Sequence, residues 1–310
     1  MTAKQTIDPA GPFSLELARG FGFGPRTGEA TPGEPLRVAF PLDDFSGHGA
    51  ALVRQAEPDG PVEVDVAAGD ATGVARQVSR ILSLDRSGTE WAAVGERDDV
   101  IGRLQREHHY LRPVLFHSPY EAAAWAVISQ RRHPNQARAV RSRLARELGE
   151  VFELAGDEAE SFPLPAALCQ LEGLEGLEPR RLERLRAVGE AALDGRLDVE
   201  RLRAMDPDEA IAALQQLPGI GPFYAMLIVV RAAGATDALA SEEPIVRAYV
   251  GPSTGSERPR ARRSSARSPS AGARTAPGRP SSSATRATER ACRGRSGGAE
   301  SPRVSEPGAR

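Results

Sequence analysis

The sequence predicts an α+β protein, with a small antiparallel-sheet N-terminal domain, an all-helical second domain and a disordered C-terminal tail. Three observations predict this class: strand-like alternation with turn signals before residue 67, helical punctuation after residue 111, and a change of composition after residue 250. We therefore place the three segments at residues 1–110, 111–250 and 251–310. The length of 310 residues and the hydrophobic content of 40% suit two soluble globular domains.

The first domain is expected to be a small sheet covered by helices. The turn residues Glu-Pro-Asp-Gly at 57–60 lie between two apolar-rich runs, which is the pattern of a hairpin. After them, Val74, Val78 and Ile81 keep helical spacing. The expected strands are 36–40, 51–56 and 62–66, and the expected covering helices are 71–84 and 97–108.

The second domain is punctuated as a series of helices. Ser118-Pro-Tyr-Glu121 is a capping box with proline at the first helical position, which predicts a helix from Pro119 to about Arg131. Pro134 begins another helix, which Gly149 ends. The expected later helices are one that starts at Asp206 and runs through Leu214, and an apolar one at 223–230.

The third segment has a composition that cannot form a packed core. Residues 251–310 hold thirteen Arg and four Glu, no aromatic residue, and Val304 as the one large aliphatic residue. Such a chain cannot bury enough apolar surface to offset its conformational entropy, so we expect it to be disordered. The abrupt change after Val250 also leads to the hypothesis that the tail is an out-of-frame translation, which would leave the helical domain incomplete at its C-terminal end.

The charge distribution decides what a nucleic-acid function would require. The formal net charge is −2, and because the tail alone carries +9, the other residues carry −11. Non-specific affinity for DNA comes largely from neutralising phosphates, so an acidic body needs a local basic stripe or backbone anchors. One candidate stripe, with a solvated helix face as its alternative, consists of Arg131, Arg132, Arg138, Arg141, Arg143 and Arg146.

Several other classes of protein are not expected. The chain contains no run of about 18 apolar residues, and its start lacks the pattern of a secretory signal, so we expect a cytoplasmic protein with no membrane partner. Cys169 and Cys292 lie far apart with no Cys or His at metal-ligand spacing, which argues against a zinc or iron-sulfur site. Four histidines have no carboxylate at a useful spacing and receive no role: His108, His109, His117 and His133.

The most informative motif is Leu217-Pro-Gly-Ile-Gly221, which lies between two expected helices. Glycines at 219 and 221 allow a tight turn without a Cβ, and they leave backbone N–H groups at the start of the second helix free to bind a phosphate. Such an anchor binds DNA of any sequence. A purely structural turn between packed helices is the alternative.

This motif resembles the hairpin of the helix-hairpin-helix DNA glycosylases. The segments 111–116 and 119–130 resemble the entry to the catalytic domain in the 3-methyladenine DNA glycosylase II group, and the resemblance covers about residues 10–250. It implies a monomeric base-excision repair enzyme that flips alkylated purines out of damaged double-stranded DNA and hydrolyses the N-glycosidic bond. The DNA-binding positions that it implies are Gln130, Arg131 and Arg132 in a minor-groove loop, and Pro218, Gly219, Ile220 and Gly221 in the hairpin.

The resemblance also assigns the chemistry. The essential carboxylate of the family maps to Glu243, and it would stabilise the oxocarbenium character of the sugar as the bond breaks. The pocket aromatic of the family maps to Phe223, with Trp125 as a second candidate and core packing as the alternative for both. No cofactor is required, but the family implies a sodium or potassium ion held by the backbone carbonyls of Gln215, Leu217 and Ile220.

Two departures from the family limit this interpretation. Glycosylases that also cut the strand use a lysine as the Schiff-base nucleophile. The only lysine is Lys4, and the matching position is Phe223, so no lyase step is expected. The family usually has Asp where this chain has Glu243, and the added methylene matters because catalytic placement is sensitive to about 1 Å. The alternatives left open are a catalytically inactive DNA-binding relative and a helical partner-binding module.

Overall fold

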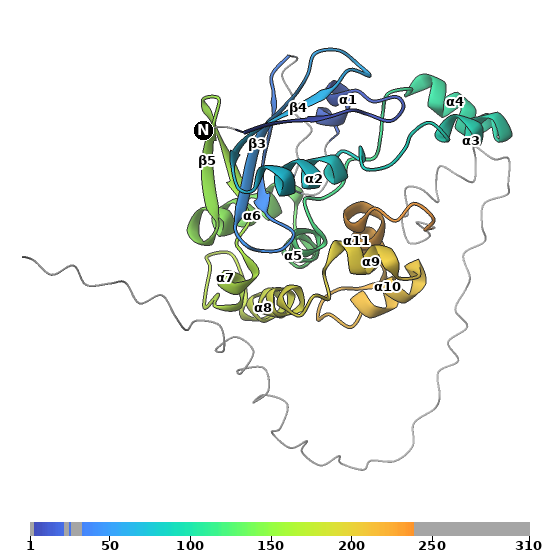
Figure 1. The fold of residues 1–310 in the computed structure, drawn as a ribbon. Helices are drawn as coiled ribbons and strands as arrows, with labels where there is room; N and C mark the ends of the chain where they lie inside the picture. The colour runs from blue at the N-terminus through green and yellow to red at the C-terminus, as the bar shows by residue number, and fades with distance from the viewer. Residues whose placement is uncertain (1–2, 22–24, 26–32, 239–310) are drawn as a thin grey trace, which may run out of the picture. The chain divides into compact units, whose positions relative to one another are not determined.

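The computed structural model describes residues 3–21, 25 and 33–238, all of which belong to one compact unit (Figure 1). They combine a small antiparallel sheet with many helices, as the mixed class requires. The predicted domain boundaries stay a prediction. Two further expectations, the disordered tail at 251–310 and the placement of Glu243, lie outside the described residues.

Two main hydrophobic clusters organise the described chain. The first packs a sheet against a helix and extends along the sequence to Val114. The second surrounds a central helix and begins at Phe116, with one aromatic ring from the first part of the chain, Phe45, against its edge. We therefore call residues 3–114 the sheet region and residues 115–238 the helical region. No helix in these ranges is long and apolar enough to span a lipid bilayer.

The sheet has four antiparallel strands in the order β1-β4-β3-β2. Successive side chains of β4 point to opposite faces of the sheet, and Val62, Val64 and Val66 are buried on one of them. Strands β3 and β4 pair on either side of the predicted turn, where Asp59 has a φ of 64°, so the hairpin prediction is confirmed. The sequence gives no sign of β1, because this edge strand is largely exposed. The strands are β1 (Ala3–Ile7), β2 (Leu36–Pro41), β3 (His48–Gln55) and β4 (Val62–Ala68).

Helix α2 lies along this sheet (Figure 1). Its Val74, Val78 and Ile81 are each at most 1% exposed, so their helical spacing does correspond to burial. The helix expected at 97–108 is confirmed as α4, which starts where the Asp98 carboxylate accepts hydrogen bonds from two amides. A short helix that was not predicted, α3, precedes it. The helices of the sheet region are α1 (Leu15–Arg19), α2 (Ala71–Ile81), α3 (Trp91–Arg97) and α4 (Asp99–Glu107).

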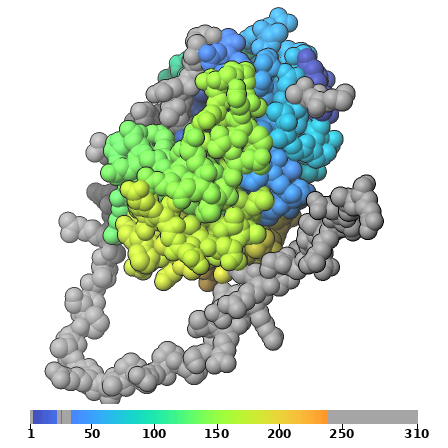
Figure 2. All heavy atoms as spheres, turned by 90° about the vertical axis from the view of Figure 1, so that its left-hand side faces the viewer, coloured from blue at the N-terminus to red at the C-terminus, as the bar shows by residue number. Residues whose placement is uncertain are grey.

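The helical region is not all-helical, which corrects the prediction for residues 111–250. A two-stranded hairpin, β5 (Glu150–Leu154) and β6 (Asp157–Ser161), follows helix α6. Its strands are short and rich in Glu, so the sequence carries little strand pattern there. Arg37 of β2 pairs with Asp157 of the hairpin at 2.7 Å. Figure 2 shows the hairpin beside the sheet region. A long-range contact therefore supports these strands.

Helix α5 is the centre of the helical region. Ten of its residues are buried, so it has no polar face. Ser118 caps it by accepting a hydrogen bond from the amide of Glu121 at 3.1 Å, which confirms the predicted start. Gly149 follows α6, also as predicted. The helices are α5 (Pro119–Ser129), α6 (Pro134–Leu148), α7 (Pro165–Cys169), α8 (Pro179–Leu193), α9 (Val199–Ala204), α10 (Pro207–Leu214), α11 (Pro222–Ile228) and the π-helix η1 (Val229–Ala233).

Candidate nucleic-acid interface

The Leu217–Gly221 motif forms the turn between α10 and α11. Leu217 and Ile220 are 3% and 4% exposed and fix the turn to the core, while Pro218 is exposed. Gly219 has a φ of +93°, a conformation that favours glycine. A Cβ at Gly221 would meet nothing within 4 Å, so the backbone at the start of α11 is open to a ligand. The turn therefore has the form that backbone binding of a phosphate requires.

A second turn, residues 130–133 between α5 and α6, lies against this hairpin. The side-chain amide of Gln130 donates to the carbonyl of Gly219, and its oxygen accepts from Arg184 at 3.1 Å. Arg181 donates to the Gln130 carbonyl at 2.6 Å and to two carbonyls at the end of α5. The structure thus joins two predicted DNA-binding segments that are far apart in the sequence.

Sequence reasoning missed Arg181 and Arg184. They are three positions apart on α8, so they share one face of the helix. Arg184 also lies under the hairpin, because a Cβ at Gly219 would come within 2.9 Å of its Cδ. Basic residues at this spacing are common on helix surfaces, and only their contacts with the two turns distinguish them.

Arg131 is the most exposed of the three residues predicted for the minor-groove loop. Gln130 is held by the hairpin, and Arg132 donates to the carbonyl of Gly176 and pairs with Glu178 at 3.7 Å. Arg131 has a φ of 53° and makes no hydrogen bond or ion pair with other described residues. Left-handed backbone strains a residue with a Cβ by about 1–2 kcal/mol. The fold therefore tolerates backbone strain at Arg131 and leaves its side chain accessible to a ligand.

A substitution of Arg131 can show whether its side chain contributes to DNA binding without a contribution to folding. Arg131→Gly removes the side chain and suits the left-handed backbone, so we expect an unfolding free energy within about 1 kcal/mol of the parent. Affinity for duplex DNA should fall about tenfold, equivalent to ~1.4 kcal/mol. Fluorescence anisotropy with labelled duplex measures the affinity, and Arg97→Ala, an exposed arginine on α3, is the control that should bind normally. Equal loss in both variants would mean that only total charge matters.

The six arginines of the candidate basic stripe do not form one basic face. Four of them are bound to carboxylates within the protein, so their charge is already compensated. The prediction of a free basic stripe along α6 is therefore wrong. Of the six predicted arginines, Arg131 is an exposed one that lies outside α6. The four pairs are Arg132–Glu178, Arg141–Glu121, Arg143–Glu175 and Arg146–Glu160.

The two predicted pocket aromatics occupy different environments. Phe223 is partly exposed in the first turn of α11, and its ring meets that of Tyr224 edge-on at 5.2 Å. The Tyr224 hydroxyl lies 3.1 Å from the Ser129 hydroxyl, next to the 130–133 turn. Trp125 is 7% exposed within the core around α5, as expected for a packing residue. Base binding stays a prediction for both, and Phe223 is the better placed.

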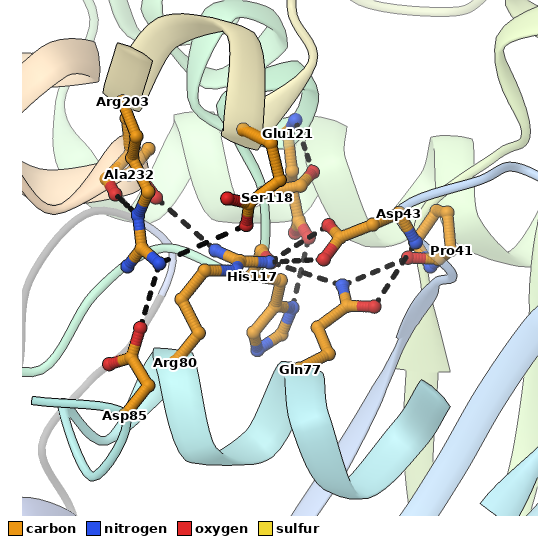
Figure 3. A network of polar contacts seen from close by, with 12 residues as sticks. Pro41, Asp43, Gln77, Arg80, Asp85, His117, Ser118, Glu121, Arg203 and Ala232 are labelled. Atoms are coloured by element: carbon orange, nitrogen blue, oxygen red, sulfur yellow. Dashed lines mark hydrogen bonds and ion pairs between the residues drawn. The ribbon is translucent and has the colours of Figure 1, made fainter. Parts of the chain in front are cut away.

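A buried ion-pair network connects α5 to its surroundings (Figure 3). Glu121, 2% exposed, accepts from Arg141 at 2.6 and 2.9 Å and lies 2.9 Å from His117 Nδ1. This contact corrects the expectation that His117 has no carboxylate partner, since the two are four positions apart. Burial opposes ionisation of Glu121, but the nearby Arg141 and His117 outweigh it and hold its pKa well below the usual value.

Glu121 should make stability depend on acid pH. A carboxyl whose folded pKa is depressed stabilises the fold above its unfolded pKa, near 4.5, and loses that contribution as the pH falls below it. Glu121→Gln removes the nearer carboxylate partner of the partly buried Arg141 and leaves it with Glu160 at 3.8 Å, so we expect about 2–3 kcal/mol of destabilisation at pH 7 and a flatter decline between pH 5 and 3. Urea unfolding at several pH values measures both. Parallel declines in the two proteins would assign the acid sensitivity elsewhere.

Comparison with known proteins adds the family context. No protein-family model matches the sequence, and no curated protein matches it either. Among solved structures, a 3-methyladenine DNA glycosylase from Archaeoglobus fulgidus matches with a TM-score of 0.63 at 21% identity, over 80% of this chain and 85% of that one. The apo 8-oxoguanine glycosylase/lyase of Clostridium acetobutylicum matches with a TM-score of 0.57 at 15% identity, over 81% and 86%. The chain has the fold of the helix-hairpin-helix DNA glycosylases.

The described residues include some of the predicted site positions, whose roles stay predictions. The Leu217–Gly221 turn and the 130–133 turn are described, whereas Glu243 lies outside the described residues. Asp237, the last acidic residue before it that is described, is exposed. The described part of the chain contains no group of three or more His, Cys, Asp or Glu residues able to hold a metal ion.

The predicted monovalent cation would rely on backbone oxygens of the Leu217–Gly221 turn. The Leu217 carbonyl accepts the Ile220 amide at 3.0 Å and keeps a second lone pair for a ligand. Oxygen ligands of this kind suit hard cations. The Leu217 carbonyl therefore has the chemistry for such an ion, whose presence stays a prediction.

Proposed function

We propose that this protein is a monofunctional DNA repair glycosylase that removes alkylated purines from double-stranded DNA. One observation carries the proposal: within a glycosylase fold, the Gly219–Gly221 hairpin is joined through Gln130 to a turn that presents Arg131. The hairpin supplies a phosphate anchor that is indifferent to sequence. The second turn supplies a side chain for the distorted duplex.

The reaction requires the base to leave the helix before the bond breaks. An enzyme cannot reach the bond inside a duplex, so it extrudes the nucleotide and fills the gap with protein side chains. We assign gap filling to Arg131 and positioning of its turn to Gln130. Glu243 would provide the negative charge that stabilises the oxocarbenium-like sugar and activates water. A monovalent cation on the hairpin carbonyls would strengthen phosphate binding.

Alkylated purines are favoured over 8-oxoguanine for a chemical reason. They carry positive charge, so they are good leaving groups and stack well on electron-rich rings such as that of Phe223. The solved 8-oxoguanine glycosylase/lyase is named for a second, strand-cutting step. Such a step uses an amine nucleophile, and this chain has Phe223 at the position that matches the family's lysine.

Base release from methylated duplex DNA tests the proposal. The purified chain should release methylated purines and leave abasic sites that break only after alkali, while a duplex with 8-oxoguanine opposite cytosine stays intact. Chromatography of the released bases and gel analysis of the strands give the two readouts. Strand cleavage without alkali would contradict the monofunctional assignment.

A second candidate, a DNA-binding relative without catalysis, is favoured by one observation. The sequence has Glu243 where the resemblance predicts Asp, and one methylene shifts a carboxylate by about the distance to which catalysis is sensitive. Duplex binding without base release would support this candidate. Absence of both binding and release would instead support a helical partner-binding module.

A further inference from the structure

The end of the π-helix η1 is held by three groups from distant parts of the chain. The last carbonyls of a helix have no partner within it and must find one elsewhere. Here three consecutive carbonyls each accept a hydrogen bond from a different segment. The donors are the Phe116 amide to Arg231 (2.8 Å), the Arg80 guanidinium to Ala232 (3.2 Å) and the Arg203 guanidinium to Ala233 (2.6 Å).

Arg80 reaches this helix end from the sheet region (Figure 3). It lies on α2, is 3% exposed, and contacts both carboxylate oxygens of Asp43 at 2.8 and 3.0 Å. The same guanidinium donates to the His117 carbonyl at 2.6 Å, just before α5. One buried cation therefore connects the sheet, the start of the central helix and the end of η1.

Arg203 makes a parallel connection. Its Nη1 pairs with Asp85 of the sheet region at 2.8 Å, and its Nε donates to the Ala233 carbonyl. The side chain is 15% exposed. A positive charge at a helix C-terminus is favourable because the unpaired carbonyls carry partial negative charge.

Gly234 fixes the direction in which the chain leaves this end. It has a φ of +77°, and its amide returns to the Val229 carbonyl to close the helix. A Cβ here would come within 2.9 Å of Leu115 and 3.2 Å of Arg203. The exit of η1 is thus restricted both by its backbone and by its neighbours.

We propose that Arg80 and Arg203 are positioning residues through which the sheet region sets the exit of the hairpin helix for catalysis. The chain runs from Gly234 into the segment that contains Glu243, nine positions further along the sequence. This inference rests on the proposed function. The sheet region would therefore be part of the catalytic apparatus by way of its ion pairs, Asp43–Arg80 and Asp85–Arg203.

The experiment compares Arg80→Met and Arg203→Met with a matched control, Arg112→Met. Arg112 is also buried, at 8%, and donates to five carbonyls, all within the sheet region. All variants are studied well below their melting temperatures. Arg80→Lys, which keeps the charge and a donor, tests for rescue.

The first readout is hydrogen exchange of peptides spanning residues 226–238. We expect exchange there to rise about tenfold in Arg80→Met and Arg203→Met and to stay unchanged in Arg112→Met, because local opening follows the lost contacts. This readout needs no catalysis. Unchanged exchange in the first two variants would overturn the proposal, whether or not the protein excises bases.

The second readout is the single-turnover rate of base excision with affinity for abasic duplex measured in parallel. The first two variants should lose at least about tenfold in rate with affinity near normal, since small misplacements of catalytic groups are enough to slow a reaction by that factor. Arg80→Lys should recover part of the rate. Normal rates in both Met variants would overturn the positioning role. An inactive parent protein would instead refute the proposed function, and hydrogen exchange would then decide whether Arg80 and Arg203 hold the end of η1.

Discussion

Glu243→Gln should abolish excision of methylated purines while leaving duplex binding nearly intact. Glutamine keeps the size and much of the hydrogen-bonding ability of glutamate but removes the charge that stabilises the developing sugar cation. Removing one such electrostatic group typically slows the chemical step by about 10²–10³-fold. Single-turnover assays with methylated duplex measure the step directly, and anisotropy measures binding.

The neighbouring acid provides the control for that result. Glu242→Gln makes the same chemical change one position earlier, so it should lower the excision rate by less than about threefold, below ~1 kcal/mol. Both residues precede Pro244, which suits the first position of a helix, so either carboxylate can serve as a cap. Equal activity of the two variants would show that capping is their common role and that the catalytic carboxylate is elsewhere.

Alanine at the two hairpin glycines should weaken DNA binding in two different ways. Gly221 has ordinary backbone and open space around its missing Cβ, so Gly221→Ala should leave the fold unchanged and obstruct the approach of a phosphate. Affinity should fall about tenfold for all duplex sequences, equivalent to ~1.4 kcal/mol. A titration against several unrelated duplexes measures this loss.

Gly219→Ala should affect both folding and binding. A Cβ at φ +93° is strained by about 1–2 kcal/mol and would displace Arg184, which in turn holds Gln130. The melting temperature should therefore fall together with the affinity, unlike in Gly221→Ala. If both variants bind every duplex normally, the hairpin is a structural turn and not a phosphate anchor.

The local structure of the candidate site was predictable where glycine spacing and helix caps specify the backbone. The Gly-Ile-Gly spacing specifies a turn that few other sequences allow, and its position between helices follows from the Asp206 cap of α10 and from Pro222 at the first position of α11. Arg181 and Arg184 were not predictable, because no local rule distinguishes them from other helix-surface arginines. Their role depends on contacts with Gln130, 51 and 54 residues earlier in the chain, and Arg184 also lies against Gly219, which comes later.

Ion pairs likewise depend on long-range contacts that local sequence patterns do not predict. The sequence suggests a basic stripe on α6, but the fold places carboxylates opposite those arginines and compensates their charge. Residues four positions apart, such as His117 and Glu121, could have been paired by spacing, but His117 precedes the helix and so falls outside the helical rule. Spacing rules fail at such boundaries.

The sequence by itself determined the starts of α5, α6 and α10, the β3–β4 hairpin and the Gly219–Gly221 turn, because caps, prolines, glycines and alternation act within a few residues of chain. The tertiary structure alone decided three features: the β5–β6 hairpin, the selection of Arg131 as the presented side chain, and the attachment of η1 to Arg80. Each of these depends on which distant groups the fold brings together. Desolvation then makes the pairing of a buried charge or carbonyl obligatory, and no local pattern names its partner.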